Sequence, residues 1–268
     1  MNTGNFQLEQ YLQKYLTYLQ IEKNCSPTTL HCYRAELEKL LAYLDDKIAN
    51  ANDIKIDLLR DYIYGSCQKR KLSPNSIYKL ISIFKSFFNY LEENGFMEKN
   101  PTRAIRLPRK IKPIPKAVSD DDFKRLADCI KFSPARCRKN YIRDSLIFYI
   151  LYYCGLRRCE LLNLSWEDID LGKQWLIVRC GKNKKDRIIP LHPKVMEFLD
   201  LYLTQRLPLK NNALIIGEQG NKLNLNSFNN IVNMHLLVCG IKKKGYSAHS
   251  FRHYVECYIM VSVAAIVR

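Results

Sequence analysis

The sequence predicts a mainly α-helical protein with one small β-sheet, divided into two domains. The chain has 268 residues and 47% of them are apolar, which is enough for two hydrophobic cores. Apolar residues recur at helical spacing through most of the chain, and strand-like patterns occur at about residues 166–191. We therefore expect an N-terminal helical bundle followed by a mixed α+β domain.

Four helices are expected in the first hundred residues. Ser26-Pro27 and Ser73-Pro74 each place a capping side chain before a proline at the first helical position, which is typical of helix starts. Gly95 provides a stop, and Asn100-Pro101 ends the unit because the residue before a proline disfavours helix. The expected helices cover about residues 8–20, 27–44, 54–69 and 74–91. The aromatic residues on these helices are predicted to be core rather than base-stacking residues, namely Tyr11, Tyr15, Phe84 and Phe88.

The segment from Arg103 to Lys116 is basic and rich in proline. It contains six cations and no acidic residue, and Pro108, Pro113 and Pro115 make it extended and stiff. Such a strap can follow a nucleic-acid backbone, whereas the ordinary alternative is a plain linker.

The second domain is expected to begin at Ser119. Three aspartates follow it, where they favour the positive end of a helix, and a basic cluster comes next (Arg136, Arg138, Lys139 and Arg143). Residues 145–154 are apolar almost all round, which predicts a buried helix that stops at Gly155. Strands are expected at residues 166–171, 174–180 and 187–191, where Pro190 restricts the last strand to an edge or an end. Helices are then expected at about residues 193–206 and 225–239.

Charge and cysteine content narrow the class of protein. The chain has 43 basic and 26 acidic residues, a net charge of +17, which indicates a polyanionic partner such as nucleic acid or an anionic membrane surface. Residues 1–24 lack a signal-peptide pattern, and the longest apolar runs are too short to cross a bilayer, so no membrane is expected. The ten cysteines include no Cys-x-x-Cys pair. We expect reduced thiols in a cytosolic protein, with no metal and no cofactor.

Three short stretches carry candidate chemistry. His249 and Arg252 are three residues apart, so on a helix they share a face and form a pocket for a phosphate diester. Arg157 follows the predicted helix break, where its guanidinium can be directed into a cleft and oriented by Glu160. Lys182 lies in the polar turn between two strands, where it could protonate a departing alkoxide. Taken singly, these stretches are also compatible with a solvated helix face, a surface ion pair and a solvated hairpin lysine.

The order of these stretches resembles a known family. Gly-Leu-Arg-x-x-Glu-Leu at residues 155–161 precedes a Gly-Lys hairpin that ends in Arg-Ile-Ile-Pro-Leu at residue 191, and His-x-x-Arg-His follows at residues 249–253. This arrangement is similar to that of the tyrosine recombinases (phage integrases), in particular the Xer-like and transposon integrases. Residues 73–108 also resemble the family's core-binding domain and linker. The resemblance covers residues 8–255 and implies a SAM-like core-binding bundle at 1–107, a linker at 108–117 and a catalytic domain at 118–268.

The resemblance implies a mechanism. A tyrosine attacks the scissile phosphate of duplex DNA to form a 3′-phosphotyrosyl link, which the 5′-hydroxyl of a partner strand then reverses. By motif position, Arg157 and Arg252 would bind the nonbridging oxygens of the phosphate. Glu160 would hold the arginines in place without contacting the phosphate itself. His249 would hydrogen-bond the phosphate and assist proton transfer, and Lys182 would be the general acid for the 5′-oxygen. No metal is required, because the arginines take its role.

The end of the sequence departs from the family pattern. The family continues after His-x-x-Arg through Leu-Gly-His to the nucleophilic tyrosine, but this chain has 268 residues, so only 16 follow Arg252, and none of them form Leu-Gly-His. Tyr254 and Tyr258 are not at the family spacing, and six residues place Tyr258 about 240° around a helix from Arg252. We therefore expect this chain to lack its own nucleophile and the family's last helices, as a truncated or frame-shifted ending would.

The expected partner is double-stranded DNA in the cytoplasm, at the nucleoid. Self-association on DNA as the family's tetramer is implied, and a full-length recombinase is another candidate partner. The residues predicted to contact the DNA backbone are Lys69, Arg70, Lys71, Arg103, Arg106, Arg109, Lys110, Lys112, Lys184, Lys185, Lys242, Lys243 and Lys244. Two alternatives stay open. One is a non-catalytic DNA-binding protein that occupies recombination sites or uses a partner's tyrosine, and the other is a basic RNA-binding protein.

Overall fold

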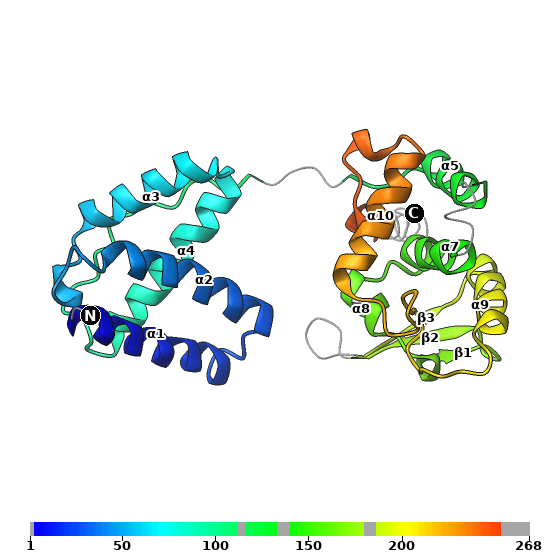
Figure 1. Ribbon diagram of the computed structural model, residues 1–268, viewed down its shortest axis with the longest axis horizontal. Coiled ribbons are helices and arrows are strands. Elements are labelled where there is room, and N and C mark those ends of the chain that lie inside the picture. The colour runs from blue at the N-terminus through cyan, green and yellow to red at the C-terminus, as the bar shows by residue number, and fades with distance from the viewer. Residues whose placement is uncertain (1–2, 112–115, 133–139, 180–185, 253–268) are drawn as a thin grey trace, which may run out of the picture. The chain divides into compact units, whose positions relative to one another are not determined.

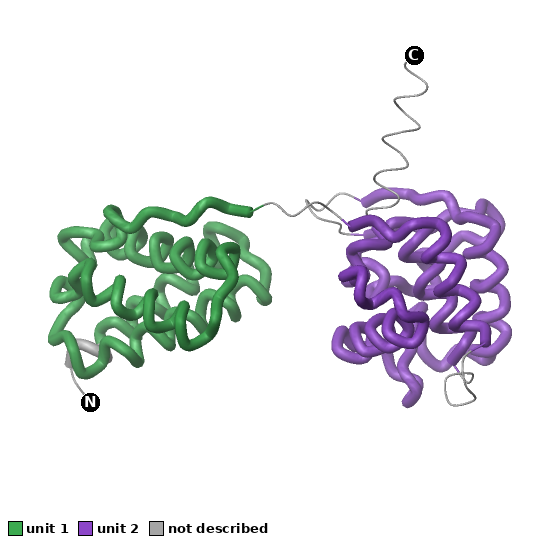
Figure 2. Tube along the Cα trace, turned by 90° about the horizontal axis from the view of Figure 1, so that it is seen from above, with its two compact units in different colours: residues 1–113 green, residues 114–268 purple. Residues whose placement is uncertain are grey.

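The computed structural model describes residues 3–111, 116–132, 140–179 and 186–252. The chain divides into two compact units, residues 1–113 and 114–268 (Figure 2). The division falls inside the basic, proline-rich segment at residues 108–117. Each unit has a hydrophobic core of its own.

Unit 1 is a helical bundle, as the sequence predicts. Its helices are α1 (Thr3–Ile21), α2 (Pro27–Leu44), α3 (Ile56–Arg70) and α4 (Pro74–Glu93), and a single 3-10 turn covers Ala51–Asp53 (Figure 1). The predicted caps are confirmed, because the Ser26 and Ser73 side chains accept hydrogen bonds from main-chain amides in the first turns of α2 and α4. Gly95 follows α4 with a φ of +70°, a conformation that glycine adopts without strain.

Aromatic side chains fill the core of unit 1. Tyr15, Phe84 and Phe88 are fully buried. Tyr11 is half-buried and stacks on Phe96 with the ring centroids 4.4 Å apart. The prediction that these four aromatic residues serve the core is therefore confirmed.

Unit 2 combines helices with a small sheet. Its described helices include α5 (Asp120–Lys131), α7 (Tyr141–Tyr149), α8 (Arg158–Asn163), α9 (Pro193–Arg206) and α10 (Leu225–Val238). The sheet, which lies at one end of the unit in Figure 1, has the order β1 (Ile169–Asp170), β2 (Trp175–Val178) and β3 (Arg187–Pro190), with both pairs antiparallel. Among the described helices, none is long and apolar enough to cross a membrane.

The first predicted strand is partly wrong. Trp166–Asp168 forms a 3-10 turn, and only Ile169–Asp170 pairs with β2. The cause is local, because the Asp168 carboxylate accepts hydrogen bonds from the amide and hydroxyl of Ser165 and so closes the turn. The prediction for Pro190 is confirmed, since it is the last residue of the edge strand β3 and lies opposite Trp175.

The predicted buried helix forms the centre of unit 2. It begins as α7 and continues through Ile150–Cys154 as a π-helical turn, which the sequence did not predict, and then ends at Gly155. Leu146, Ile147 and Phe148 are almost completely inaccessible to solvent.

A buried ionic network connects the same helix to α10. The Arg143 guanidinium binds Asp144 Oδ1 through Nε at 2.8 Å and Nη2 at 2.7 Å, and Asp144 Oδ2 lies 2.9 Å from His235 Nε2. The three side chains are 8%, 4% and 2% exposed. Arg143 is therefore a core residue and not part of an exposed basic cluster. Arg136, Arg138 and Lys139 lie outside the described residues.

Candidate active site

The site begins where the buried helix breaks. Gly155 adopts a left-handed conformation with a φ of +59°, and Arg157 is the N-cap of α8. This break turns the chain away from the core, so the Arg157 side chain is partly exposed (37%) although it comes directly after a buried segment. The predicted break before Arg157 is confirmed.

Glu160 holds Arg157 in two ways. Its Oε2 atom accepts a hydrogen bond from the Arg157 main-chain amide at 2.8 Å, which is the glutamate half of a capping box. Its Oε1 atom accepts one from Arg157 Nη1 at 2.7 Å. The carboxylate therefore fixes both the backbone and the guanidinium of Arg157.

Arg187 joins this pair from the sheet. As the first residue of β3, it donates from Nη1 to Glu160 Oε1 at 3.1 Å and from Nη2 to Glu160 Oε2 at 2.7 Å. Sequence reasoning included Arg187 in a motif but treated it only as a strand residue. The sequence signal that could have identified Arg187 was its position in a basic motif, directly after the hairpin turn that carries Lys182.

The last described helical turn brings in Arg252. Residues 248–252 are helical, and Ser250 Oγ accepts a hydrogen bond from the Ser247 amide at the start of the turn. Phe251 anchors it in the core, and the Ser250 carbonyl accepts a hydrogen bond from the Val118 amide. Arg252 Nη1 then lies 2.7 Å from the Gly155 carbonyl oxygen and 3.9 Å from Glu160 Oε2.

His249 lies on the same turn as Arg252. It is exposed and comes three residues earlier, so the predicted helical spacing of the two residues is observed. Lys182 lies outside the described residues, as do Tyr254 and Tyr258.

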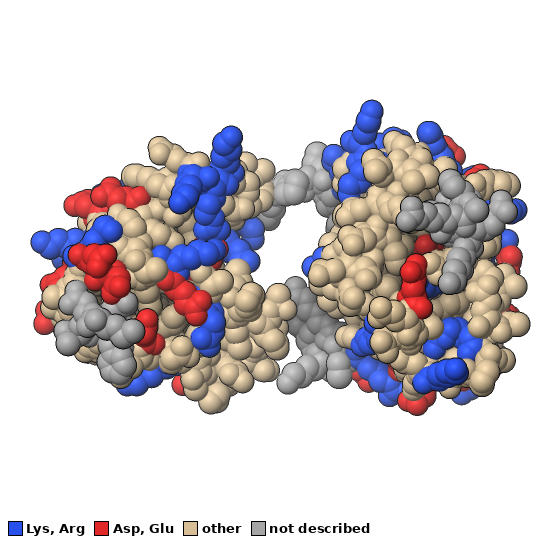
Figure 3. Space-filling model, in the orientation of Figure 1, with Lys and Arg blue, Asp and Glu red and all other residues tan. Residues whose placement is uncertain are grey.

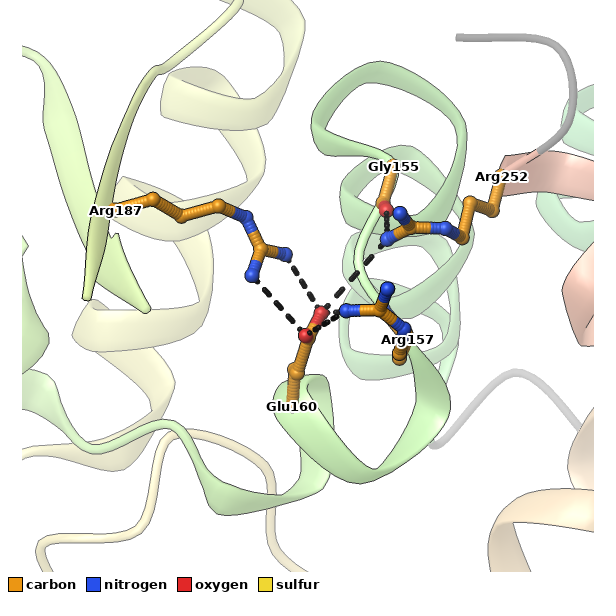
Figure 4. Close-up of polar contacts among 5 residues, drawn as sticks. All are labelled: Gly155, Arg157, Glu160, Arg187 and Arg252. Carbon is orange, nitrogen blue, oxygen red and sulfur yellow. Dashed lines mark hydrogen bonds and ion pairs between the residues drawn. The ribbon is translucent and has the colours of Figure 1, made fainter. Parts of the chain in front are cut away.

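The cluster in Figure 4 thus contains three guanidinium groups and one carboxylate. Burial raises the pKa of Glu160, but the hydrogen bonds from Arg187 and Arg157 outweigh this and bring it to about 2. The carboxylate is therefore ionised at neutral pH and the cluster keeps an excess of positive charge. Such a cluster suits a phosphate anion, whose oxygens accept paired hydrogen bonds from guanidinium groups. Within the described residues, no group of three His, Cys, Asp or Glu side chains is placed to hold a metal ion.

Several cations predicted to contact DNA have acidic partners within their own unit. Arg70 binds Glu36 through two hydrogen bonds of 2.7 and 2.9 Å, and Arg103 binds Glu92 at 2.9 Å. Lys244 Nζ lies 2.8 Å from both carboxylate oxygens of Asp122. Lys242 has a neutral partner and contacts the side chain of Asn233.

The other predicted cations fall into two groups. Those that are exposed are Lys69, Lys71, Arg106, Arg109, Lys110 and Lys243. Those outside the described residues are Lys112, Lys184 and Lys185. Figure 3 shows that the basic side chains on the face in view form several separate groups, with acidic side chains between them on unit 1.

Part of the basic strap is attached to α4. The Ile111 amide donates to Asn75 Oδ1 at 3.1 Å, and Asn75 Nδ2 donates to the Ile111 carbonyl at 2.9 Å. Nearer the start of the strap, Lys85 Nζ donates to the Thr102 carbonyl at 2.8 Å. Arg103 itself lies in a turn that precedes the extended part of the strap. The exposed cations Arg106, Arg109 and Lys110 therefore lie on a segment that is held at both ends.

Comparison with known proteins decides the family. The phage integrase family profile matches residues 116–262, and the profile of the phage integrase N-terminal SAM-like domain matches residues 12–95. A tyrosine recombinase from Pseudothermotoga lettingae is 32% identical over 254 residues, which cover 94% of this chain and 85% of that protein. The chain belongs to the phage integrase family. The family comprises the tyrosine recombinases, which break and rejoin DNA.

Solved structures of other phage integrase family proteins share the fold. The XerH site-specific recombinase bound to its difH substrate matches with a TM-score of 0.67 and 20% identity, covering 91% of this chain and 70% of that one. A lambda integrase dimer bound to a COC′ core site matches with a TM-score of 0.66 and 18% identity, covering 92% of this chain and 68% of that one. The predicted combination of a SAM-like bundle with a mainly helical second domain that carries a small sheet is confirmed.

Proposed function

We propose that this phage integrase family chain is a site-specific DNA recombinase whose strand-exchange chemistry takes place at the Arg157–Glu160–Arg252 cluster. The observation that carries this proposal is the convergence of Arg157 and Arg252 on one carboxylate, although they lie 95 residues apart in the sequence. Two fixed guanidinium groups around a common point form a receptor for a tetrahedral phosphate.

The two arginines would act on the scissile phosphate. Negative charge on the nonbridging oxygens increases as the phosphate becomes five-coordinate, and guanidinium groups that are already in place stabilise that charge without reorganising. Glu160 would not touch the DNA. Its role would be to hold Arg157 in position and to limit the repulsion among the neighbouring guanidinium groups.

Proton transfer would involve the other motif residues. A tyrosine hydroxyl attacks phosphorus and loses its proton, with His249 placed beside Arg252 to assist. The bond from phosphorus to the 5′-oxygen breaks, and Lys182 would supply the proton that this oxygen takes up. Attack by the 5′-hydroxyl of a partner strand reverses both transfers, so the reaction needs no cofactor.

Unit 1 and its strap would bind the DNA backbone. Arg106, Arg109 and Lys110 are exposed on a stiff, attached segment, and each phosphate they contact would release condensed counterions. A dimer bound to DNA and a tetramer bound to a Holliday junction occur among the lambda integrase structures with this fold. We propose that this chain also self-associates on DNA, at the cytoplasmic nucleoid.

A suicide substrate tests the proposal. The wild-type chain first selects a duplex from a random-sequence library, and a nicked form of that duplex then traps any covalent protein–DNA adduct. An adduct in the wild type would support the proposal and overturn the expectation that this chain lacks its own nucleophile. That adduct should be lost in R157A and R252A, with DNA affinity changed less than about threefold because these residues act mainly in the transition state. Y254F and Y258F identify whether either tyrosine forms the link.

The same assay evaluates the non-catalytic alternative. The spacing of Tyr258 from Arg252 favours that alternative, in which the chain occupies recombination sites or accepts a tyrosine from a partner such as a full-length recombinase. Tight, selective duplex binding without an adduct would support it. Equal affinity for RNA and for the selected duplex would instead contradict both DNA-based readings.

A further inference from the structure

We propose that Arg187 is a positioning residue of the phosphate-binding cluster and acts through Glu160. This inference deepens the proposed function and rests on it. Neither the motif-based prediction nor the proposed mechanism gives this side chain a role.

The contacts of Glu160 show what Arg187 contributes. Each carboxylate oxygen accepts one hydrogen bond from Arg157 and one from Arg187. Arg187 thus supplies half of the four close hydrogen bonds that fix the plane of the carboxylate. Without Arg187, the Glu160 carboxylate could rotate about its terminal torsion and Arg157 would lose a fixed partner.

The guanidinium fork is essential to this arrangement. Its two Nη atoms lie 3.1 and 2.7 Å from the two oxygens of one carboxylate, a paired geometry that a lysine ammonium cannot reproduce. The main chain of Arg187 is held independently, because it lies opposite Val178 in the β2–β3 ladder. The sheet therefore provides a rigid base from which the fork orients Glu160.

The geometry also explains why Arg187 would act indirectly. Each of its Nη atoms donates one of its two N–H groups to Glu160, so the guanidinium faces the carboxylate and its remaining N–H donors are directed away from that carboxylate. Its side chain is only partly buried, with 34% exposed, so its removal leaves no large cavity in the core. A loss of function in an Arg187 variant can therefore be separated from a loss of folding.

A double-mutant cycle tests the inference. The variants are R187A, R187K, E160Q and E160Q/R187A, and the readout is the rate of adduct formation on the nicked duplex. We expect R187A and R187K each to slow adduct formation about 100-fold, because small misplacements of catalytic groups have effects of that size. In the E160Q background, R187A should not slow adduct formation further, because the carboxylate through which Arg187 acts is already absent.

K173A is the matched control. Like R187A, it removes one cation and one ion pair from the sheet region. Lys173, however, lies in the turn before β2, at the end of the β2–β3 ladder that is farther from the Val178–Arg187 pair. K173A should react at the wild-type rate. Thermal unfolding of every variant measures any loss of stability.

Two outcomes would overturn the inference. If R187K retained the wild-type rate, positive charge alone would be sufficient and the fork would have no positioning role. If the losses from E160Q and R187A multiplied, Arg187 would act independently of Glu160, for example by direct contact with the phosphate.

A second readout separates this inference from the proposed function. Binding of inorganic phosphate to Arg157 and Arg252 is followed in the same variants through the NMR signals of their Nε–Hε groups. If the wild type forms no adduct, the proposed function fails, and the phosphate affinities alone decide the inference. Weaker binding in both R187A and R187K, with no further loss in E160Q/R187A, supports it, whereas unchanged affinity in R187K overturns it.

Discussion

Arg252 donates a hydrogen bond from Nη1 to the main-chain carbonyl of Gly155 at 2.7 Å. The contact joins the last described helical turn to the point where the π-helical segment ends. Gly155 has a φ of +59°, and this left-handed conformation directs the chain into α8. The backbone of Gly155 therefore positions two arginines of the candidate site, Arg157 through the chain that follows it and Arg252 through its carbonyl oxygen.

Replacing Gly155 with alanine should affect both stability and activity. A Cβ atom in the left-handed region costs about 1 kcal/mol, and relief of that strain would shift the carbonyl that Arg252 contacts. We expect G155A to unfold at a lower denaturant concentration and to form the adduct about tenfold more slowly. G95A is the control, because Gly95 has a similar φ of +70° but lies in unit 1 with nothing within 4 Å of an added Cβ. An equal loss of adduct in both variants would contradict the assigned role of Gly155.

The ionisation of Glu160 should make stability depend on pH. Its pKa falls from 4.5 to about 2 in the folded chain, so its stabilisation is fully present above pH 4.5 and is lost as the pH falls toward 2. The difference in unfolding free energy between wild type and E160Q should therefore shrink by up to about 3 kcal/mol over that range. Urea unfolding at a series of pH values measures it, and a difference that stayed constant from pH 6 to pH 3 would refute the pairing.

Detaching the strap should weaken DNA binding. N75A removes both hydrogen bonds that hold Ile111 to α4. The free energy of DNA binding must then include the entropic cost of ordering the strap. We expect duplex affinity, measured by fluorescence anisotropy, to fall about threefold, and hydrogen exchange at the Ile111 amide to become faster. S73A serves as control. It removes the cap of the same helix at a cost of about 1 kcal/mol but leaves Ile111 bound, so exchange at that amide should not change.

The buried ionic network should be important for stability. D144A leaves the Arg143 guanidinium buried without its carboxylate partner and removes the hydrogen bond to His235, which should lower the unfolding free energy by about 3 kcal/mol or more. E197A breaks the half-exposed pair of Glu197 with Lys194 and should cost less than about 1 kcal/mol. Chemical denaturation measures both variants. Similar losses in the two would show that burial does not determine the cost at Asp144.

The sequence predicted most of the helices because their signals are local. Ser26 and Ser73 mark helix starts through contacts three residues away, and apolar periodicity marks the faces that are buried. The prediction was wrong where a short-range side-chain bond competed with strand propensity, as at Ser165 and Asp168. The π-helical turn after Tyr149 was also missed, because no local pattern distinguishes it from the α-helix that it extends.

The sequence predicted the motif residues of the candidate site and the pairing of Glu160 with Arg157, but not the contact of Glu160 with Arg187. Arg157, Glu160 and Arg252 were identified from their order and spacing, and the structure brings them together. Arg187 was missed because its partner lies 27 residues away on a different element. Three of the cations predicted to contact the DNA backbone have acidic partners, namely Arg70, Arg103 and Lys244. Only the folded units bring these partners within reach.

The sequence by itself determined the helical character, the two-part organisation, the net charge of +17 and the motif residues. These features depend on residue type and on spacing within one or two helical turns. Only the tertiary structure decided which cations are paired, that Arg143 is buried, and that one carboxylate connects Arg157, Arg187 and Arg252. The physical reason is that ion pairing and burial depend on distances of a few ångströms between segments far apart in the chain, and packing sets those distances.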